Sequence, residues 1–121
     1  MPRKIKIQTN AGPPSTGTHS QAIRVGDLVF VSGQLALKPD HAEIVGDTIG
    51  EQTEQVMQNL GAILDEAGSG LDKLVKTTVY LVDLGDFAGM NEVYARYVGS
   101  VPPARATVEI SALPSGAKVE I

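Results

Sequence analysis

At 121 residues the chain has the length of one domain, and we expect a single domain over residues 1–121. It has no cysteine, which excludes disulfide scaffolds, cysteine-ligated zinc sites and thiol catalysis. A net charge of −4 argues against nucleic acid as a partner, because phosphates are held mainly by clustered Lys and Arg. No apolar run has the length of a signal peptide core or a membrane span, so we expect a cytosolic protein with no membrane partner.

The first third of the chain predicts strands and one long loop. Residues 3–8 alternate polar and apolar side chains, as a half-buried strand does, and their basic residues suit a solvated sheet edge. Residues 11–18 are rich in Gly, Pro, Ser and Thr and are expected to form a loop. Strands are then predicted at 22–25 and 28–31, joined by a hairpin turn at Gly26-Asp27, because Gly tolerates the positive φ of such turns.

A helix is the clearest element in the middle of the chain. Residues 47–68 place apolar side chains at steps of three and four, and Thr48 and Glu51 match a capping box at the start. Gly68 provides the stop. Residues 74–82 are rich in β-branched side chains and predict a strand.

A second helix and two strands are expected in the last third. The helix begins at Asp86 and ends before Gly99. Its apolar stripe consists of Phe87, Met90, Val93, Tyr94, Tyr97 and Val98. Strands are predicted at 105–110 and 117–121, with a turn at 114–116 between them. The expected order is therefore β-β-β-α-β-α-β-β.

Two of the predicted strands are apolar on both faces, which points to an assembly. Residues 28–31 and 79–82 are continuous apolar runs, whereas two helices can cover only one face of a sheet this wide. We therefore expect a homo-oligomer whose sheets cover one another, with pockets at the subunit boundaries.

The chain lacks the signatures of several enzyme classes. His19 and His41 lie far apart in sequence without a cysteine or a His-Glu motif, so no metal site is expected. Gly68-Ser69-Gly70 follows a helix and lacks the Lys of a P-loop, and it is interpreted as the helix stop. Ser32 is not in a nucleophile elbow, which disfavours a serine hydrolase.

Arg105 and Glu120 remain as the chemically useful pair. If the last two strands pair across their turn, both side chains lie near one end of the sheet. The planar guanidinium of an arginine suits a substrate carboxylate, because it donates two parallel hydrogen bonds. The alternative is a cross-strand ion pair between Arg105 and Glu120, and spacing alone leaves both interpretations open.

Several short motifs lie in a fixed order along nearly the whole chain. They are Val31-Ser32-Gly33-Gln34, residues 75–81, Asp83-Leu84, Asp86-Phe87, Asn91, Tyr94, Pro103-Ala104-Arg105 and Val119-Glu120-Ile121. In these motifs the sequence resembles the RidA/YjgF family of reactive intermediate deaminases. The resemblance implies an α+β, chorismate mutase-like fold in which a mixed sheet carries two helices on one face. It also implies a homotrimer with a central barrel and three clefts between subunits.

By the same resemblance, the chain hydrolyses short-lived 2-imino acids, such as 2-iminopropanoate and 2-iminobutanoate, to 2-keto acids and ammonia. PLP-dependent dehydratases release these imines and their enamines. Arg105 would bind the substrate carboxylate, and Glu120 would hold and activate the attacking water. The cleft would be completed by Ser32, Gly33, Asn91 and the main chain of Thr107. No cofactor is implied, because the imine is already reactive.

The chain departs from the family pattern at three positions. His19 stands where many members have a pocket tyrosine, which would change substrate choice, and the alternative is a histidine of the loop surface. Thr107 stands where a cysteine is common, with a mild expected effect. The sequence ends at Ile121, so Glu120 is expected next to a terminus that can fray. For Asn91 the alternative is an ordinary exposed helix residue.

Three other functions fit parts of the same pattern. A sensor or scavenger would hold a keto acid or another small carboxylate in the same cleft without turnover. A chorismate mutase would need several cations around a dicarboxylate, and only Arg105 is placed for that role. An endoribonuclease, a label that family members often carry, is disfavoured by the acidic charge and the missing pair of catalytic histidines.

Overall fold

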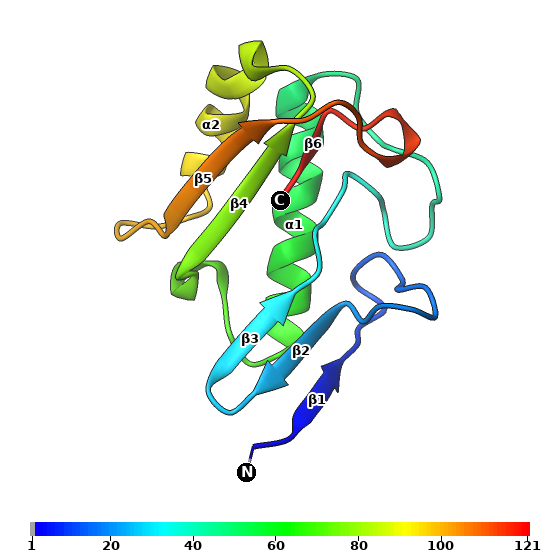
Figure 1. Ribbon diagram of the computed structural model, residues 1–121, viewed down its shortest axis with the longest axis vertical. Helices are drawn as coiled ribbons and strands as arrows, with labels where there is room; N and C mark the ends of the chain where they lie inside the picture. Colours follow the sequence, from blue (N-terminus) through cyan, green and yellow to red (C-terminus); the bar gives the residue numbers. More distant parts are fainter. Residues whose placement is uncertain (1) are drawn as a thin grey trace.

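The computed structural model describes residues 2–121, and its elements follow the predicted order (Figure 1). The strands are β1 (Lys4–Ile7), β2 (Ala22–Val25), β3 (Leu28–Val31), β4 (Lys76–Leu81), β5 (Ala104–Glu109) and β6 (Val119–Glu120). The helices are α1 (Ile49–Glu66) and α2 (Phe87–Ala95), and short 3₁₀ turns lie at Leu71–Lys73, Leu84–Asp86 and Pro114–Gly116. The predictions for 22–25 and 28–31 match β2 and β3 to the residue.

The second helix is shorter than its predicted apolar stripe. Helix α2 ends at Ala95, so Tyr97 and Val98 follow it rather than belong to it. The amide of Tyr97 donates to the carbonyl of Tyr94 at 3.0 Å, an i to i−3 bond that tightens the chain after the last α-helical turn. Val98 is still buried against the core, which is why the stripe continues in the sequence.

The strands form two three-stranded sheets that meet at one point. β1, β2 and β3 pair antiparallel in that order, while β4 lies between β5, which is parallel to it, and β6, which is antiparallel. The main chains of Gln34 and Ile121 exchange hydrogen bonds of 2.8 and 3.1 Å. The segment after β3 is thereby joined to the end of β6, and the second sheet continues the first.

The pairing of the last two strands differs from the prediction. β5 and β6 do not pair with each other across a turn but lie on opposite edges of β4. Helix α2 provides the crossover that a parallel β4–β5 pair requires. At the other edge of β4, β6 gains hydrogen-bond partners on both of its sides, β4 and the segment at Gln34.

Helix α1 begins with the predicted capping box. Thr48 Oγ1 accepts a hydrogen bond from the amide of Glu51 at 3.1 Å, and Glu51 Oε1 accepts one from the amide of Thr48 at 3.2 Å. Both amides would otherwise lack a partner, because the first turn of a helix offers none. The capping box therefore fixes the start of the longest element of the fold.

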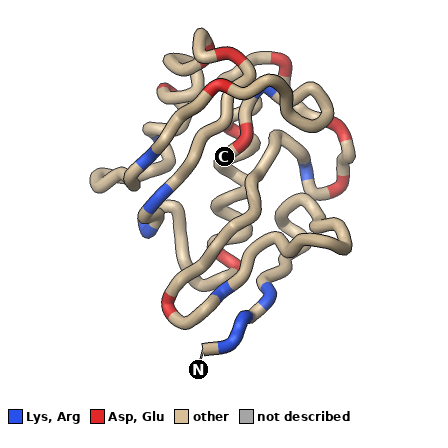
Figure 2. The backbone as a smooth tube through the Cα atoms, in the orientation of Figure 1, with Lys and Arg blue, Asp and Glu red and all other residues tan. Residues whose placement is uncertain are grey.

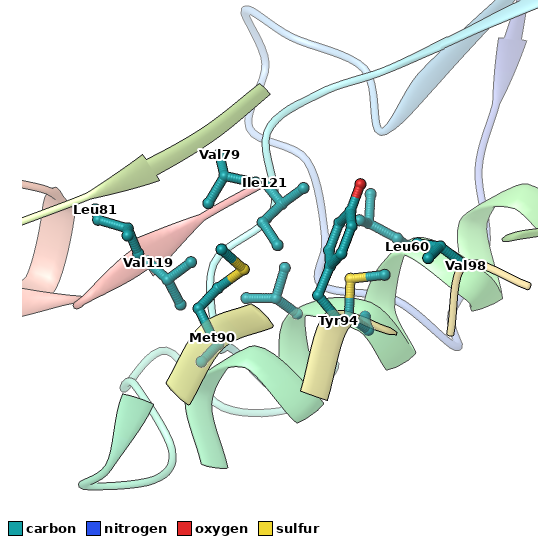
Figure 3. Packing of buried hydrophobic residues seen from close by; sticks show 11 residues of the cluster. Leu60, Val79, Leu81, Met90, Tyr94, Val98, Val119 and Ile121 are labelled. Carbon is teal, nitrogen blue, oxygen red and sulfur yellow. The ribbon is translucent and has the colours of Figure 1, made fainter. Parts of the chain in front are cut away.

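The main core lies between the helices and the second sheet (Figure 3). Its buried members are Ala36, Val56, Met57, Leu60, Val79, Leu81, Met90, Tyr94, Val98, Val119 and Ile121. Within β4 the buried residues alternate, with Thr77, Val79 and Leu81 turned towards the helices. The intervening residues of β4 face the other way.

Both helices lie on one side of the strands, which leaves an open face on the other side (Figure 1). On this open face Leu28 is 59% exposed, Phe30 60% and Val108 41%. Their neighbours Val29 and Val31 pack against the smaller core cluster beneath the first sheet. The prediction that the helices leave an apolar face uncovered is therefore confirmed.

Candidate active site

Arg105 lies on β5 with its guanidinium against α2. In the parallel pairing it is in register with Thr77, which faces the helices. Arg105 Nη1 donates a hydrogen bond to Asn91 Oδ1 at 2.7 Å. Arg105 Cζ lies 5.2 Å from the ring centroid of Phe87 and 4.9 Å from that of Tyr94. One amide and two aromatic rings therefore hold the charged group.

Helical periodicity explains why α2 provides these three contacts together. Phe87, Asn91 and Tyr94 follow an i, i+4, i+7 spacing, which places them on one face of the helix. Tyr94 is buried at 3% exposure, whereas Phe87 is 37% exposed at the edge of the group. This face of α2 thus binds the guanidinium of Arg105 through an amide and two aromatic rings.

Glu120 lies on β6 and belongs to the open face. It pairs with Tyr80, whose neighbours Val79 and Leu81 turn the opposite way into the core. Burial raises the pKa of the half-buried Glu120 carboxyl above its ordinary value. A Cβ atom at Gly33 would lie 2.8 Å from both Cδ and Oε2 of Glu120. Only glycine at position 33 leaves the carboxylate where it is.

Ser32 and His19 lie on the segments beside Gly33. The Ser32 hydroxyl donates to the carbonyl of Ser20 at 2.6 Å, which ties the early loop to the end of β3. His19 is exposed, and its Nδ1 lies 3.0 Å from Thr16 Oγ1. The hydroxyl of Ser32 is therefore engaged with the main chain, and the ring of His19 belongs to the loop surface of this chain.

A cavity of about 1240 Å³ opens between β3 and β4, beside Glu120. Gly33 and Glu120 line it together with Leu60 and Leu64 of α1. Its cationic lining residues are Arg3, Arg24, Lys73 and Lys76. Figure 2 shows basic residues along β1, on β2 and at the start of β4. These charges favour an anionic ligand. Arg105 does not line this cavity.

Arg105 and Glu120 are separated within one chain. Their register partners, Thr77 and Tyr80, are three positions apart on β4, so the two side chains point to opposite faces. Strand geometry puts them roughly 10 Å apart along β4 and roughly 10 Å apart across it. Among residues 2–121 the salt bridges are His41–Asp40 and Arg96–Glu92. The predicted proximity of Arg105 and Glu120, and the cross-strand ion pair offered as the alternative, are therefore wrong for a single chain.

The residues predicted for the site consequently fall into two groups. On the helix-facing side of β5 lie Arg105 and the half-buried Thr107, with Asn91 above them on α2. On the open side Glu120 and Gly33 line the cavity, and Ser32 precedes Gly33 with its hydroxyl bound to the carbonyl of Ser20, next to His19 on the loop. Each group is one half of the predicted constellation.

The part of the chain that the structure describes contains neither a group of metal ligands nor a membrane-spanning helix. Residues 2–121 contain no group of three or more His, Asp or Glu side chains arranged as metal ligands. None of the helices in this range is long and apolar enough to cross a membrane.

The family profile described as Endoribonuclease L-PSP matches residues 9–121. The chain belongs to the RidA/YjgF family. A RutC family protein of Pyrococcus abyssi is 50% identical over 118 residues, which cover 98% of this chain and 93% of that protein. The mouse 2-iminobutanoate/2-iminopropanoate deaminase is 41% identical over 119 residues, covering 98% of this chain and 87% of the mouse enzyme. The crystal structure of E. coli TdcF with bound serine has a TM-score of 0.89 at 34% identity and covers 96% and 93% of the two chains.

For this RidA/YjgF chain, the α+β fold and the family predicted from the sequence are confirmed. The contacts of Phe87 and Tyr94 with Arg105 were missed, because both residues also fit the apolar stripe of a packed helix. The signal that would have found these contacts is the helix face that both residues share with Asn91.

Proposed function

We propose that the chain is a 2-iminoacid deaminase that hydrolyses 2-iminopropanoate, 2-iminobutanoate and related imines to 2-keto acids and ammonia. The observation that carries the proposal is the guanidinium of Arg105, held by Asn91 and two aromatic rings at the edge of the sheet. The mouse relative is named for this reaction, and the structure of E. coli TdcF holds serine, a small molecule with a carboxylate. PLP-dependent dehydratases in the cytosol are the expected source of the imines.

Arg105 has the donors that a two-point grip on a carboxylate needs. A guanidinium carries five N–H groups, and the contact with Asn91 occupies one of those on Nη1. Enough donors remain for two parallel, charge-assisted hydrogen bonds to a substrate carboxylate. Because the rings and the amide already restrict the guanidinium, little orientational freedom is lost when the substrate binds.

The hydrolysis needs one activated water molecule. Its oxygen adds to the carbon of the C=N bond while a base takes one of its protons. The base then returns its proton to the nitrogen, and the hydroxyl of the adduct gives up the second proton of the water to the nitrogen as the C=O bond forms and the C–N bond breaks, so that ammonia and the 2-keto acid are released. We assign the base to Glu120, because its raised pKa gives the carboxylate a higher proton affinity. Gly33 keeps that carboxylate in place.

A site that uses both Arg105 and Glu120 must combine two chains, because the two residues face opposite sides of one sheet. We therefore place the substrate between the Arg105 group of one subunit and the Glu120 group of the next. The exposed Leu28, Phe30 and Val108 support this arrangement, since an apolar open face gains stability when another subunit covers it. The proposed assembly is a homotrimer with a central barrel and three such sites.

A coupled assay tests the reaction. An amino acid oxidase or a dehydratase generates the imine, and the appearance of keto acid is followed with and without the protein. The wild type should accelerate hydrolysis, Arg105→Ala should abolish the acceleration while keeping fold and mass, and Arg105→Lys should restore only part of it. Full activity in Arg105→Ala, or no acceleration by the wild type, would contradict the proposal.

The same experiment separates an enzyme from a binding protein. If the wild type binds a 2-keto acid in calorimetry but does not accelerate imine hydrolysis, the chain is a small-carboxylate binding protein of this fold. If both occur, Glu120→Gln should keep keto acid binding and lose turnover, because the amide cannot accept the proton of water.

A further inference from the structure

Behind Arg105 a buried hydrogen bond joins Tyr94 to Thr77. Their hydroxyl oxygens are 2.7 Å apart, and the two residues are 3% and 7% exposed. Thr77 is the register partner of Arg105 on β4, so its hydroxyl lies on the same side of the sheet as the guanidinium. Tyr94 therefore makes two contacts at once, through its hydroxyl to Thr77 and through its ring, 4.9 Å from Arg105 Cζ.

We propose that Thr77 and Tyr94 are positioning residues for Arg105. Their hydrogen bond fixes the tilt of the Tyr94 ring, and the ring fixes the guanidinium in the orientation that receives a carboxylate. The part of this inference that concerns the carboxylate rests on the proposed deaminase function. The part that concerns the orientation of Arg105 does not.

The packing of the core does not explain why both positions carry a hydroxyl. Phenylalanine at position 94 and valine at position 77 would fill almost the same space without burying polar atoms. The two hydroxyls are tolerated because each satisfies the other. The hydrogen bond restricts the orientation of the Tyr94 side chain, since the strength of a hydrogen bond depends on its angle whereas apolar contacts are not directional.

Tyr94 is the more rigid of the two rings beside Arg105. Phe87 is 37% exposed and has no polar atom that could anchor its ring. Tyr94 is buried and anchored at its hydroxyl. A cation is attracted to the face of an aromatic ring, so the attraction weakens when the ring tilts away. A loose ring at position 94 would leave Arg105 with more orientations to lose on binding.

Three variants and one control separate positioning from simple stabilisation. Thr77→Val and Tyr94→Phe each leave one buried hydroxyl without its partner, whereas the double variant removes both hydroxyls. The control is Tyr97→Phe, which removes a hydroxyl that donates to Glu54, whereas the Arg105 guanidinium is held by Asn91, Phe87 and Tyr94. Each single variant should lower the melting temperature by about 4–8 °C, and the double variant should regain most of that loss.

Binding measurements give the decisive comparison. The Kd for pyruvate, measured by calorimetry, and the KM for 2-iminopropanoate should rise about 3- to 10-fold in both single variants and stay raised in the double variant, with kcat near the wild-type value. Tyr97→Phe should change neither constant. A double variant with wild-type melting temperature, Kd and KM would show that the bond stabilises the fold and does not position Arg105.

A second readout is independent of any substrate. The side-chain Nε–H resonance of Arg105 in a ¹H–¹⁵N spectrum can be assigned from its loss in Arg105→Lys. Ring currents should shift this resonance in the wild type and in Tyr97→Phe, and the shift should change in the double variant. If the wild type neither hydrolyses imines nor binds pyruvate, the proposed function fails. An unchanged Arg105 resonance in the double variant overturns the positioning inference by itself.

Discussion

Glu120 combines a position that water can reach with an environment that disfavours its charge. Burial penalises the ionised form, so the folded chain holds the Glu120 proton more tightly than the unfolded chain does and the pKa rises above 4.5. Proton binding at Glu120 therefore favours the folded chain. This contribution to the free energy of unfolding is fully present below pH 4.5 and is lost as the pH rises through the folded pKa. Gly33 maintains this state, because any larger residue would push the carboxylate away.

A pH profile tests the role assigned to Glu120. We expect the acid limb of kcat/KM to have its midpoint above pH 4.5, because the base must be ionised to accept a proton from water. Glu120→Gln should remove this limb and lower kcat about 100-fold or more. At neutral pH the variant should be at least as stable as the wild type, since it lacks the partly buried charge.

The control for this profile is Glu109→Gln. Glu109 is an exposed carboxylate at the end of β5 that accepts a hydrogen bond from the amide of Leu84. Its replacement should leave the acid limb unchanged. An acid limb that persists in Glu120→Gln, or that disappears in Glu109→Gln, would assign the titration to another group.

At the scale of single residues, the sequence named two residues of the candidate site that lie in contact but did not predict the faces on which its residues lie. The family motifs named Arg105 and Asn91, and the structure brings these two side chains into contact, with Arg105 Nη1 donating to Asn91 Oδ1. The face to which each residue points depends on strand register, and register is set by pairing between distant segments. For Arg105 and Glu120 that pairing is with Thr77 and Tyr80, which no local pattern indicates.

At the scale of elements, local chemistry determined what could be predicted. The capping box placed the start of α1, and the Gly26-Asp27 turn placed the hairpin of β2 and β3, with Gly26 at φ 57. In contrast, β6 is two residues long and takes its place between β4 and Gln34 through contacts that are distant in sequence. A turn signal at 114–116 was present, but it could not show which strand β6 joins.

The capping box offers a test of local stability that leaves the site alone. Thr48→Ala removes the hydroxyl that accepts from the amide of Glu51, so the free energy of unfolding should fall by about 1 kcal/mol, within a range of roughly 0.5–2 kcal/mol. Denaturant titration followed by circular dichroism measures the change. Thr18→Ala, in the exposed early loop, is the control and should shift stability by less than about 0.5 kcal/mol. Equal effects of both substitutions would show that the cap does not hold α1 in place.

At the scale of the whole molecule, the exposed open face and the opposite orientation of Arg105 and Glu120 both favour the proposed assembly. One chain leaves Leu28 and Phe30 exposed and keeps Arg105 and Glu120 on opposite faces. A second chain on the open face would bury Leu28 and Phe30. It could also bring its own Arg105 to the Glu120 of its neighbour. When the same contact is repeated around a closed ring, every subunit provides Arg105 to one site and Glu120 to another, which is a property of cyclic assemblies.

Mixing of two inactive variants tests this division directly. Arg105→Ala and Glu120→Gln subunits should each form assemblies with a mass near three chains by light scattering, with little activity. When the two are unfolded and refolded together in equal amounts, about a quarter of the sites should combine an intact Arg105 from one subunit with an intact Glu120 from the next. Activity should therefore return to about a quarter of the wild-type value, because the two choices are independent. If both residues acted from the same chain, no mixture would contain an intact site. Mixed assemblies that stay inactive, with their composition verified by mass spectrometry, would thus place both halves of the site in one subunit.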